Sequence, residues 1–125
     1  MDSLCRKSAT DLADLIRKKE TSSKEVVEAH FNRISEVNPY LNAITLTLEE
    51  SAFKAAEKAD NANEEESKKP FLGVPFTVKE NIDLKGTPTT QGVPLLAESM
   101  PAKNAPIVDR MIKACLLYTS PSPRD

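Results

Sequence analysis

The sequence has few of the residues that would mark several classes of protein. It contains two cysteines and one histidine, without a disulfide framework or a metal-ligand spacing. No apolar run approaches the roughly 20 residues that cross a bilayer, and the first residues lack the apolar segment of a secretory signal. The net charge is −2 with mixed signs, so no basic patch predicts nucleic-acid binding. We therefore expect a cytoplasmic protein with no membrane span, no nucleic-acid partner, no metal and no cofactor.

Glycine is also scarce, and its placement is informative. The three glycines lie within or just beyond residues 71–83. Glycine is used where φ must be positive, or where another backbone segment or a ligand comes very close. In this stretch apolar residues recur at every second position and predict one face of a strand: Leu72, Val74, Phe76 and Val78.

By the same alternation, Lys79 belongs to the opposite face of that strand. Two interpretations of this lysine are open. If it is buried, desolvation favours the neutral amine, which can act as a base. Alternatively, Lys79 ends an edge strand and reaches water, with Glu80 as a neighbouring counter-charge.

Two capping boxes predict the first two helices. Ser8 with Asp11 precedes an apolar stripe and indicates a helix over residues 9–19, and Ser22 with Glu25 precedes a second helix.

This second helix is expected to stop at Asn38-Pro39, because a residue before proline avoids the α region. It carries His30, which has no evident carboxylate or nucleophile partner. We interpret His30 as a helix-surface or boundary residue.

Residues 41–48 alternate between apolar and threonine positions and predict a short half-buried strand. Thr47 with Glu50 predicts a third capping box, before a helix with a small-residue face of alanines. The charged residues 60–69 predict a solvated loop. Asn104, or a residue just after it, is expected to cap a last helix, with Pro106 near its first turn.

The segment 72–92, LGVPFTVKENIDLKGTPTTQG, resembles the opening of the catalytic core in the amidase signature family. The matching positions are Gly73-Val74-Pro75, Val78-Lys79-Glu80-Asn81, Lys85-Gly86 and Thr89-Thr90. Upstream, the family's turn before a strand is matched by Arg33-Ile34, Val37-Asn38-Pro39 and Leu41-Asn42-Ala43. The resemblance covers roughly residues 9–114.

The resemblance implies an α/β protein, the truncated N-terminal part of the amidase signature fold, a mixed β-sheet covered by helices. It also implies an amidohydrolase acting on a small acyl amide through a Ser–cis-Ser–Lys triad, in which Lys79 is the catalytic lysine. No serine before Ala114 lies in the Gly- and Ser-rich context of the two triad serines. We expect both serines to lie beyond the chain end and the fragment to be inactive.

The last eleven residues, CLLYTSPSPRD, show no helix or strand pattern that extends the preceding helix. One back-translation of this segment resembles the read-through of a transposon-based sequencing adapter. We interpret residues 115–125 as a sequencing-adapter artefact, and residues 1–114 as the N-terminal fragment of one amidase domain. A genuine divergent or spliced C-terminus is the alternative.

Two further functions remain open. The A subunit of aspartyl/glutamyl-tRNA amidotransferase shares the fold and triad, but usually follows its Thr-Thr pair with cysteine and a small residue. Here the pair is followed by Gln91-Gly92-Val93, which resembles stand-alone amidases and acylamidases. A non-catalytic helical interaction module is the third alternative, and the ordered match from Gly73 to Thr90 argues against it.

Overall fold

The computed structural model of the protein describes residues 2–114 and, for the backbone, residues 117–122. Its elements, in chain order, are a 3-10 helix η1 (Ser3–Arg6), α1 (Ala9–Arg17), α2 (Ser23–Leu41), α3 (Glu49–Asp60), α4 (Glu64–Ser67), β1 (Pro75–Lys79), a 3-10 helix η2 (Pro94–Leu96), α5 (Pro106–Lys113) and β2 (Leu117–Ser122). Among the described residues, no helix is both long and apolar enough to cross a membrane.

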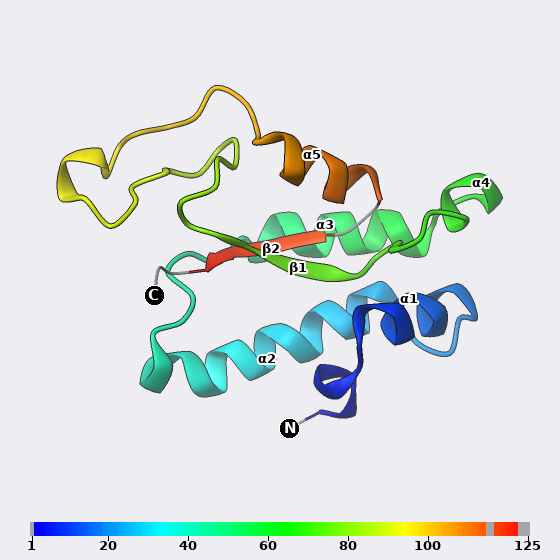
Figure 1. Ribbon diagram of the computed structural model, residues 1–125. Helices are drawn as coiled ribbons and strands as arrows, with labels where there is room; N and C mark the ends of the chain where they lie inside the picture. Colours follow the sequence, from blue (N-terminus) through cyan, green and yellow to red (C-terminus); the bar gives the residue numbers. More distant parts are fainter. Residues whose placement is uncertain (1, 115–116, 123–125) are drawn as a thin grey trace.

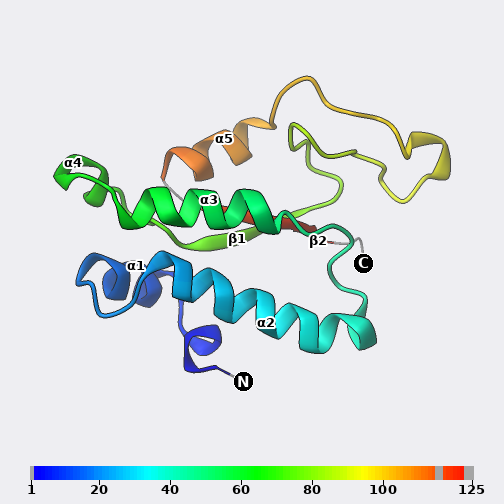
Figure 2. The ribbon, with the colours of Figure 1, turned by 180° about the vertical axis from the view of Figure 1, so that it is seen from behind.

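Two parallel strands lie between helices (Figure 1). Both views place the strands between α5 and α2, and Figure 2 shows α3 along the face of the sheet seen from behind. Helix α5 forms the crossover that a parallel pair requires. The register runs from Pro75 opposite Leu117 to Lys79 opposite Ser122, with an irregularity after Phe76. A helix-covered parallel pair is the predicted α/β arrangement.

The first two capping boxes are confirmed. Ser8 Oγ accepts a hydrogen bond from Asp11 N, and Ser22 Oγ accepts one from Glu25 N, both at 3.1 Å. In each box the carboxylate in turn accepts a hydrogen bond from the backbone N–H of the serine. These local contacts satisfy amides that have no partner inside the helix.

Helix α2 continues through Pro39 to Leu41, so the predicted stop at Asn38-Pro39 is wrong. Proline lacks the N–H that would donate to the carbonyl four residues earlier, but only two helical residues follow it, so the disruption is confined to the helix end. The helix ends instead at Asn42, which adopts the left-handed conformation with φ +49° and donates its N–H to Asn38 O at 2.7 Å.

Residues 42–48 form no strand, contrary to the prediction. The side-chain amide of Asn38 replaces a strand partner: its Oδ1 accepts from Ile44 N at 2.8 Å, and its Nδ2 donates to Ile44 O at 3.0 Å. A side chain that satisfies a peptide in this way competes with sheet formation.

Two smaller expectations about helix starts and loops are also wrong. The N-cap of α3 is Leu48, without a side-chain cap, so Thr47 and Glu50 make no capping box. The charged tract contains the short helix α4, capped by Asn63. Asparagine is a favourable N-cap residue, which explains a helical turn in a polar segment.

Apolar side chains gather in three small clusters. The first joins α1, α2 and the segment that leads into β1, the second joins α2 and α3 through the alanine face, and the third joins β1 and α5. In the second, the rings of Phe31 and Phe53 stack with centroids 5.9 Å apart. In the third, Val78 packs with Leu84 and Val108. This last cluster fixes the end of β1 against α5.

Three elements meet where the chain enters β1. Gly73 has φ +75°, and its carbonyl accepts a 2.7 Å hydrogen bond from the buried Ser23 Oγ at the start of α2. A Cβ at position 73 would lie 2.7 Å from Ser23 Oγ and 3.3 Å from the Cβ of Ala59 in α3. Both the backbone conformation and the available space therefore require glycine.

The backbone of residues 117–122 forms β2, where the sequence pattern predicted no strand. Main-chain groups make the contacts of a strand ladder, so pairing with β1 places few demands on side chains. The rest of the predicted tail, residues 115–116 and 123–125, lies outside the described residues.

Candidate functional site

Lys79, the one site residue predicted from the sequence, is the last residue of β1. Its side chain is partly buried, between Val78 at 4% exposure and Glu80 at 9%. The carbonyl of Lys79 accepts a hydrogen bond from Ile82 N at 2.9 Å, which turns the chain immediately after the strand. The lysine therefore lies at a fixed strand end.

The predicted alternation along this segment is seen in the burial. Leu72, Val74 and Val78 are buried, and Phe76 is partly buried. Thr77, on the same face as Lys79 by parity, is exposed. The side of the strand that carries the lysine is thus the more open one.

Glu80 has a role that the sequence did not indicate. Its Oε1 accepts hydrogen bonds from Thr90 N and Thr90 Oγ1, both at 2.5 Å, and from Gln91 N at 3.2 Å. The carboxylate joins the strand end to the Thr-Thr pair ten residues later. The only available signal was an acidic residue directly after a strand, followed at loop distance by threonines.

The loop of residues 90–98 is closed at its base, called the neck here, by a backbone hydrogen bond between Thr89 and Ser99. Thr89 N donates to Ser99 O at 2.9 Å. The Oγ1 of Thr89 is buried and has no hydrogen-bond partner among the residues that the structure describes. Beyond the neck the loop is apolar and open, with Leu95 96% exposed.

Residues 83–85, which lie between Glu80 and Thr89 in the chain, are held against the start of α5. Lys85 N donates to Asn104 Oδ1 at 2.7 Å, and Ala105 N donates to Asp83 O at 2.9 Å. Asn104 Nδ2 donates to Asp109 Oδ1 at 2.9 Å. Asn104 itself does not cap α5: the N-cap is Ala105, just after it, and makes no side-chain cap, with Pro106 at the start of the helix as predicted.

The other polar residues weighed from the sequence have structural explanations. His30 is partly buried and its Nδ1 donates to Val26 O at 2.7 Å, which fits the predicted boundary residue. Across residues 2–114 and 117–122, no group of three acidic, histidine or cysteine residues is placed to hold a metal ion.

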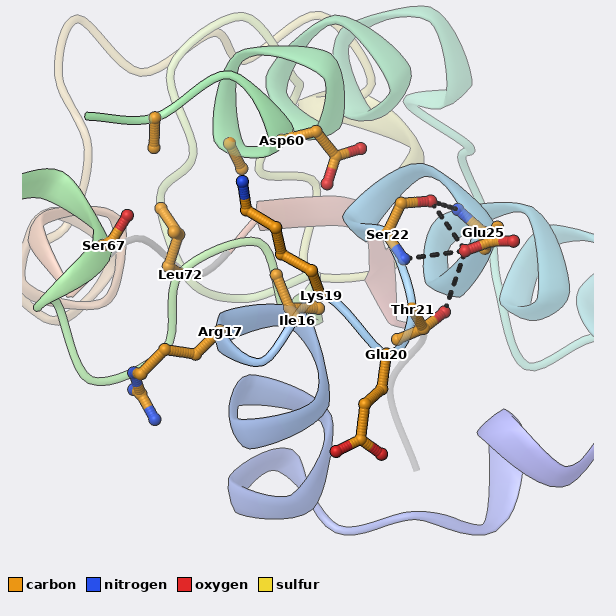
Figure 3. Close-up of a pocket in the computed structure, with 12 residues that line it drawn as sticks. Ile16, Arg17, Lys19, Glu20, Thr21, Ser22, Glu25, Asp60, Ser67 and Leu72 are labelled. Carbon is orange, nitrogen blue, oxygen red and sulfur yellow. Dashed lines mark hydrogen bonds between the residues drawn. The ribbon is translucent and has the colours of Figure 1, made fainter. Parts of the chain in front are cut away.

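A cavity of about 430 Å³ lies between the α1–α2 turn and the end of α3, where the chain approaches β1 (Figure 3). Two of its three carboxylates, those of Glu25 and Asp60, bind the start of α2. Glu25 closes the capping box on Ser22, while Asp60 accepts hydrogen bonds from Ser23 N at 2.6 Å and Lys24 N at 3.1 Å. Helix capping accounts for these groups, and the cavity is at the opposite end of β1 from the lysine.

Comparison with known protein families gives a match over most of the chain. Residues 25–119 match the family described as Amidase. The matched range contains β1, the lysine at its end, the anchored loop and α5.

Individual relatives agree with this match. Indoleacetamide hydrolase from Bradyrhizobium diazoefficiens is 42% identical over 108 residues, covering 86% of this chain and 21% of that protein. The A subunit of glutamyl-tRNA(Gln) amidotransferase from Caldanaerobacter subterraneus is 33% identical over 102 residues, covering 82% of this chain and 21% of that protein. The chain spans about a fifth of the length of the curated relatives that it matches.

A solved structure shares the backbone arrangement. The structure titled "Fatty acid amide hydrolase" superposes with a TM-score of 0.90 at 25% identity, over 98% of this chain and 22% of that one. The helices and strands described above therefore correspond to a part of that larger fold.

Proposed function

The chain belongs to the amidase family, and from this premise we propose that the complete protein hydrolyses linear carboxylic amides with Lys79 as its catalytic lysine. The observation that carries the proposal is the position of this lysine. It is partly buried at the end of β1, and the backbone beside it is held by Ile82 and by the Glu80 carboxylate. A base has to be held within hydrogen-bond reach of the proton that it accepts.

In the proposed mechanism, Lys79 completes a Ser–cis-Ser–Lys triad whose two serines lie beyond the described chain. The nucleophilic hydroxyl attacks the amide carbonyl, and its proton passes through the bridging serine to the amine of Lys79. The tetrahedral intermediate collapses, the C–N bond breaks, and the leaving nitrogen takes a proton by the same route. Water then hydrolyses the acyl ester and releases the carboxylic acid.

The substrate class proposed is a small acyl amide, turned over in the cytoplasm without a cofactor. One of the relatives is named for hydrolysis of an amide, indoleacetamide. The second candidate is the A subunit of a tRNA amidotransferase, favoured by the similarity to the glutamyl-tRNA(Gln) amidotransferase protein. The tripeptide Gln91-Gly92-Val93 supports the stand-alone amidase over this alternative.

The decisive experiment uses the complete protein. Its coding sequence is recovered beyond residue 114, and the product is assayed for amine or ammonia release from aryl acyl-anilides, indoleacetamide and fatty-acid amides. Lys79→Ala is expected to lower kcat by about 10²- to 10⁴-fold, the usual contribution of a positioned base. Lys58→Ala, which changes an exposed lysine in α3, is the matched control and should keep full activity.

Two results would contradict the proposal. One is a complete sequence without a Gly- and Ser-rich segment carrying two serines. The other is amide hydrolysis that persists in Lys79→Ala. If glutamine-dependent amidation of charged tRNA appears in place of amide hydrolysis, the second candidate function replaces the first.

We also propose that residues 1–125 alone are inactive, because both hydroxyls of the triad are expected elsewhere. The domain boundary at residue 114 is a related proposal, with residues 115–125 as an adapter-derived tail. A genuine divergent or spliced C-terminus is the alternative. Sequencing the source locus across codon 114 decides it, since a genomic CLLYTSPSPRD segment rules out the adapter.

A further inference from the structure

The carboxylate directly after the proposed catalytic lysine holds a distant loop. A single oxygen of Glu80 receives three hydrogen bonds, from the backbone and hydroxyl of Thr90 and from the backbone of Gln91. Glu80 is 9% exposed, so these bonds are largely removed from water. Hydrogen bonds to an ionised acceptor are about twice as strong as neutral ones. This arrangement is more than a surface contact.

The loop adopts an uncommon backbone conformation at the point of contact. Gln91 has φ +52° and Gly92 has φ +68°. A non-glycine residue in this region is uncommon, and it persists only where its surroundings enforce it. Thr90 Oγ1 helps, because it donates to Glu80 and accepts from Gly92 N at 3.2 Å. The carboxylate and the hydroxyl together determine the shape of the turn.

The same carboxylate fixes the strand end. The peptide between Lys79 and Glu80 lies between two restraints, the hydrogen bond from Ile82 N to the Lys79 carbonyl and the loop bonds to the Glu80 side chain. A shift of Glu80 therefore moves the backbone that carries the lysine. Misplacement of a reacting group by about 1 Å can cost about 10²-fold in rate.

We propose that Glu80 is a positioning residue, which ties the Thr90–Gly92 turn to the end of β1 and thereby sets the location of the Lys79 amine. The inference deepens the proposed amidase function and rests on it. Glu80 itself takes no part in bond making or bond breaking.

The test uses the complete enzyme with Glu80→Gln, which keeps the size of the side chain and removes the charge. The amides of Thr90 and Gln91 should exchange with deuterium at least about tenfold faster, because their acceptor is weakened. The kcat for an acyl-anilide should fall about 10- to 100-fold, with a smaller change in KM. The matched control is Glu57→Gln on the exposed side of α3, which removes the same charge and should change neither readout.

The partner hydroxyl gives an independent check. Thr90→Val removes the hydroxyl that donates to Glu80 and accepts from Gly92 N, whereas Thr90→Ser keeps it. We expect Thr90→Val to lower kcat and Thr90→Ser to retain it. In the double variant Glu80→Gln/Thr90→Val, kcat should fall by less than the product of the two single-variant fold decreases, because both changes weaken the same contact.

The outcomes separate this inference from the proposed function. Faster exchange together with lower kcat supports the positioning role. Unchanged exchange in Glu80→Gln overturns the anchor, and faster exchange with normal kcat overturns its link to the lysine, while Lys79→Ala still reports on the proposed function. If the wild-type enzyme hydrolyses no amide and faster exchange persists, the amidase proposal fails and the catalytic part of this inference fails with it.

Discussion

Replacing Gly73 by alanine tests the junction at the entry to β1. Two costs add at this position. A residue with a Cβ at positive φ loses about 1–2 kcal/mol, and φ here is +75°. The new methyl group would also lie 2.7 Å from Ser23 Oγ and 2.8 Å from Ser23 Cβ. Crowding in a packed interior costs about 1–3 kcal/mol more.

Gly86→Ala is the matched control for this prediction. Its φ is +89°, but a Cβ built there meets no atom within 4 Å. The control therefore carries the conformational cost without the steric one. We expect Gly73→Ala to lower the free energy of unfolding of the complete protein by about 2–5 kcal/mol, and Gly86→Ala by only about 1–2 kcal/mol.

Urea denaturation followed by circular dichroism measures both values, provided that the slope with denaturant is unchanged. Adding Ser23→Ala to Gly73→Ala should restore only part of the loss. It removes the Oγ contact, but leaves the close Cβ contact and the Gly73 carbonyl without its hydrogen bond. Equal losses in the two glycine variants would refute the steric argument and leave only backbone strain.

Two further predictions concern titratable groups near the N-terminus. Hydrogen bonds from the Ser22 backbone and hydroxyl lower the pKa of Glu25, and those from the Ser8 hydroxyl and backbone lower the pKa of Asp11. Because each folded-state pKa lies below its unfolded value, the stabilisation is complete above about pH 5 and is lost as the pH falls through the folded values. Ser22→Ala should therefore flatten the acid side of a stability–pH curve, and an unchanged curve would contradict the capping box. Burial, followed by the nearby Asp2 carboxylate, raises the pKa of the Cys5 thiol, whose Sγ contacts Ala29 O at 3.4 Å. At pH 8, iodoacetamide should modify Cys5 more slowly in the folded protein than in the urea-unfolded chain. Equal rates for the Cys5 peptide in mass spectrometry would exclude the raised pKa.

Local sequence signals predicted much of the fold. The Ser8 and Ser22 capping boxes were readable because every participant lies within one helical turn. The alternation before Lys79 was readable because a strand buries every second side chain. The alanine face of α3 was recognised for the same reason, as a helix repeats its faces every three or four residues.

Contacts between residues further apart in the chain explain the features that the sequence did not predict. The strand expected at residues 41–48 is absent because Asn38, in the preceding helix, satisfies Ile44 in place of a neighbouring strand. The stop expected at Pro39 is wrong because Asn38 stays helical, with its carbonyl accepting from Asn42 N and its side chain bound to Ile44. The anchor formed by Glu80 depends on a loop folding back over ten residues, which no local periodicity encodes.

The closed neck between Thr89 and Ser99 has a consequence for engineering the protein. Because a main-chain hydrogen bond joins Thr89 and Ser99, the two ends of the loop between them are held at a fixed separation. Its apolar tip, including Leu95, faces outward and packs against little of the described chain. Loops of other lengths from related enzymes could replace residues 93–98, giving chimeras with altered surfaces and an unchanged strand end, because Thr90 and Gln91 stay bound to Glu80.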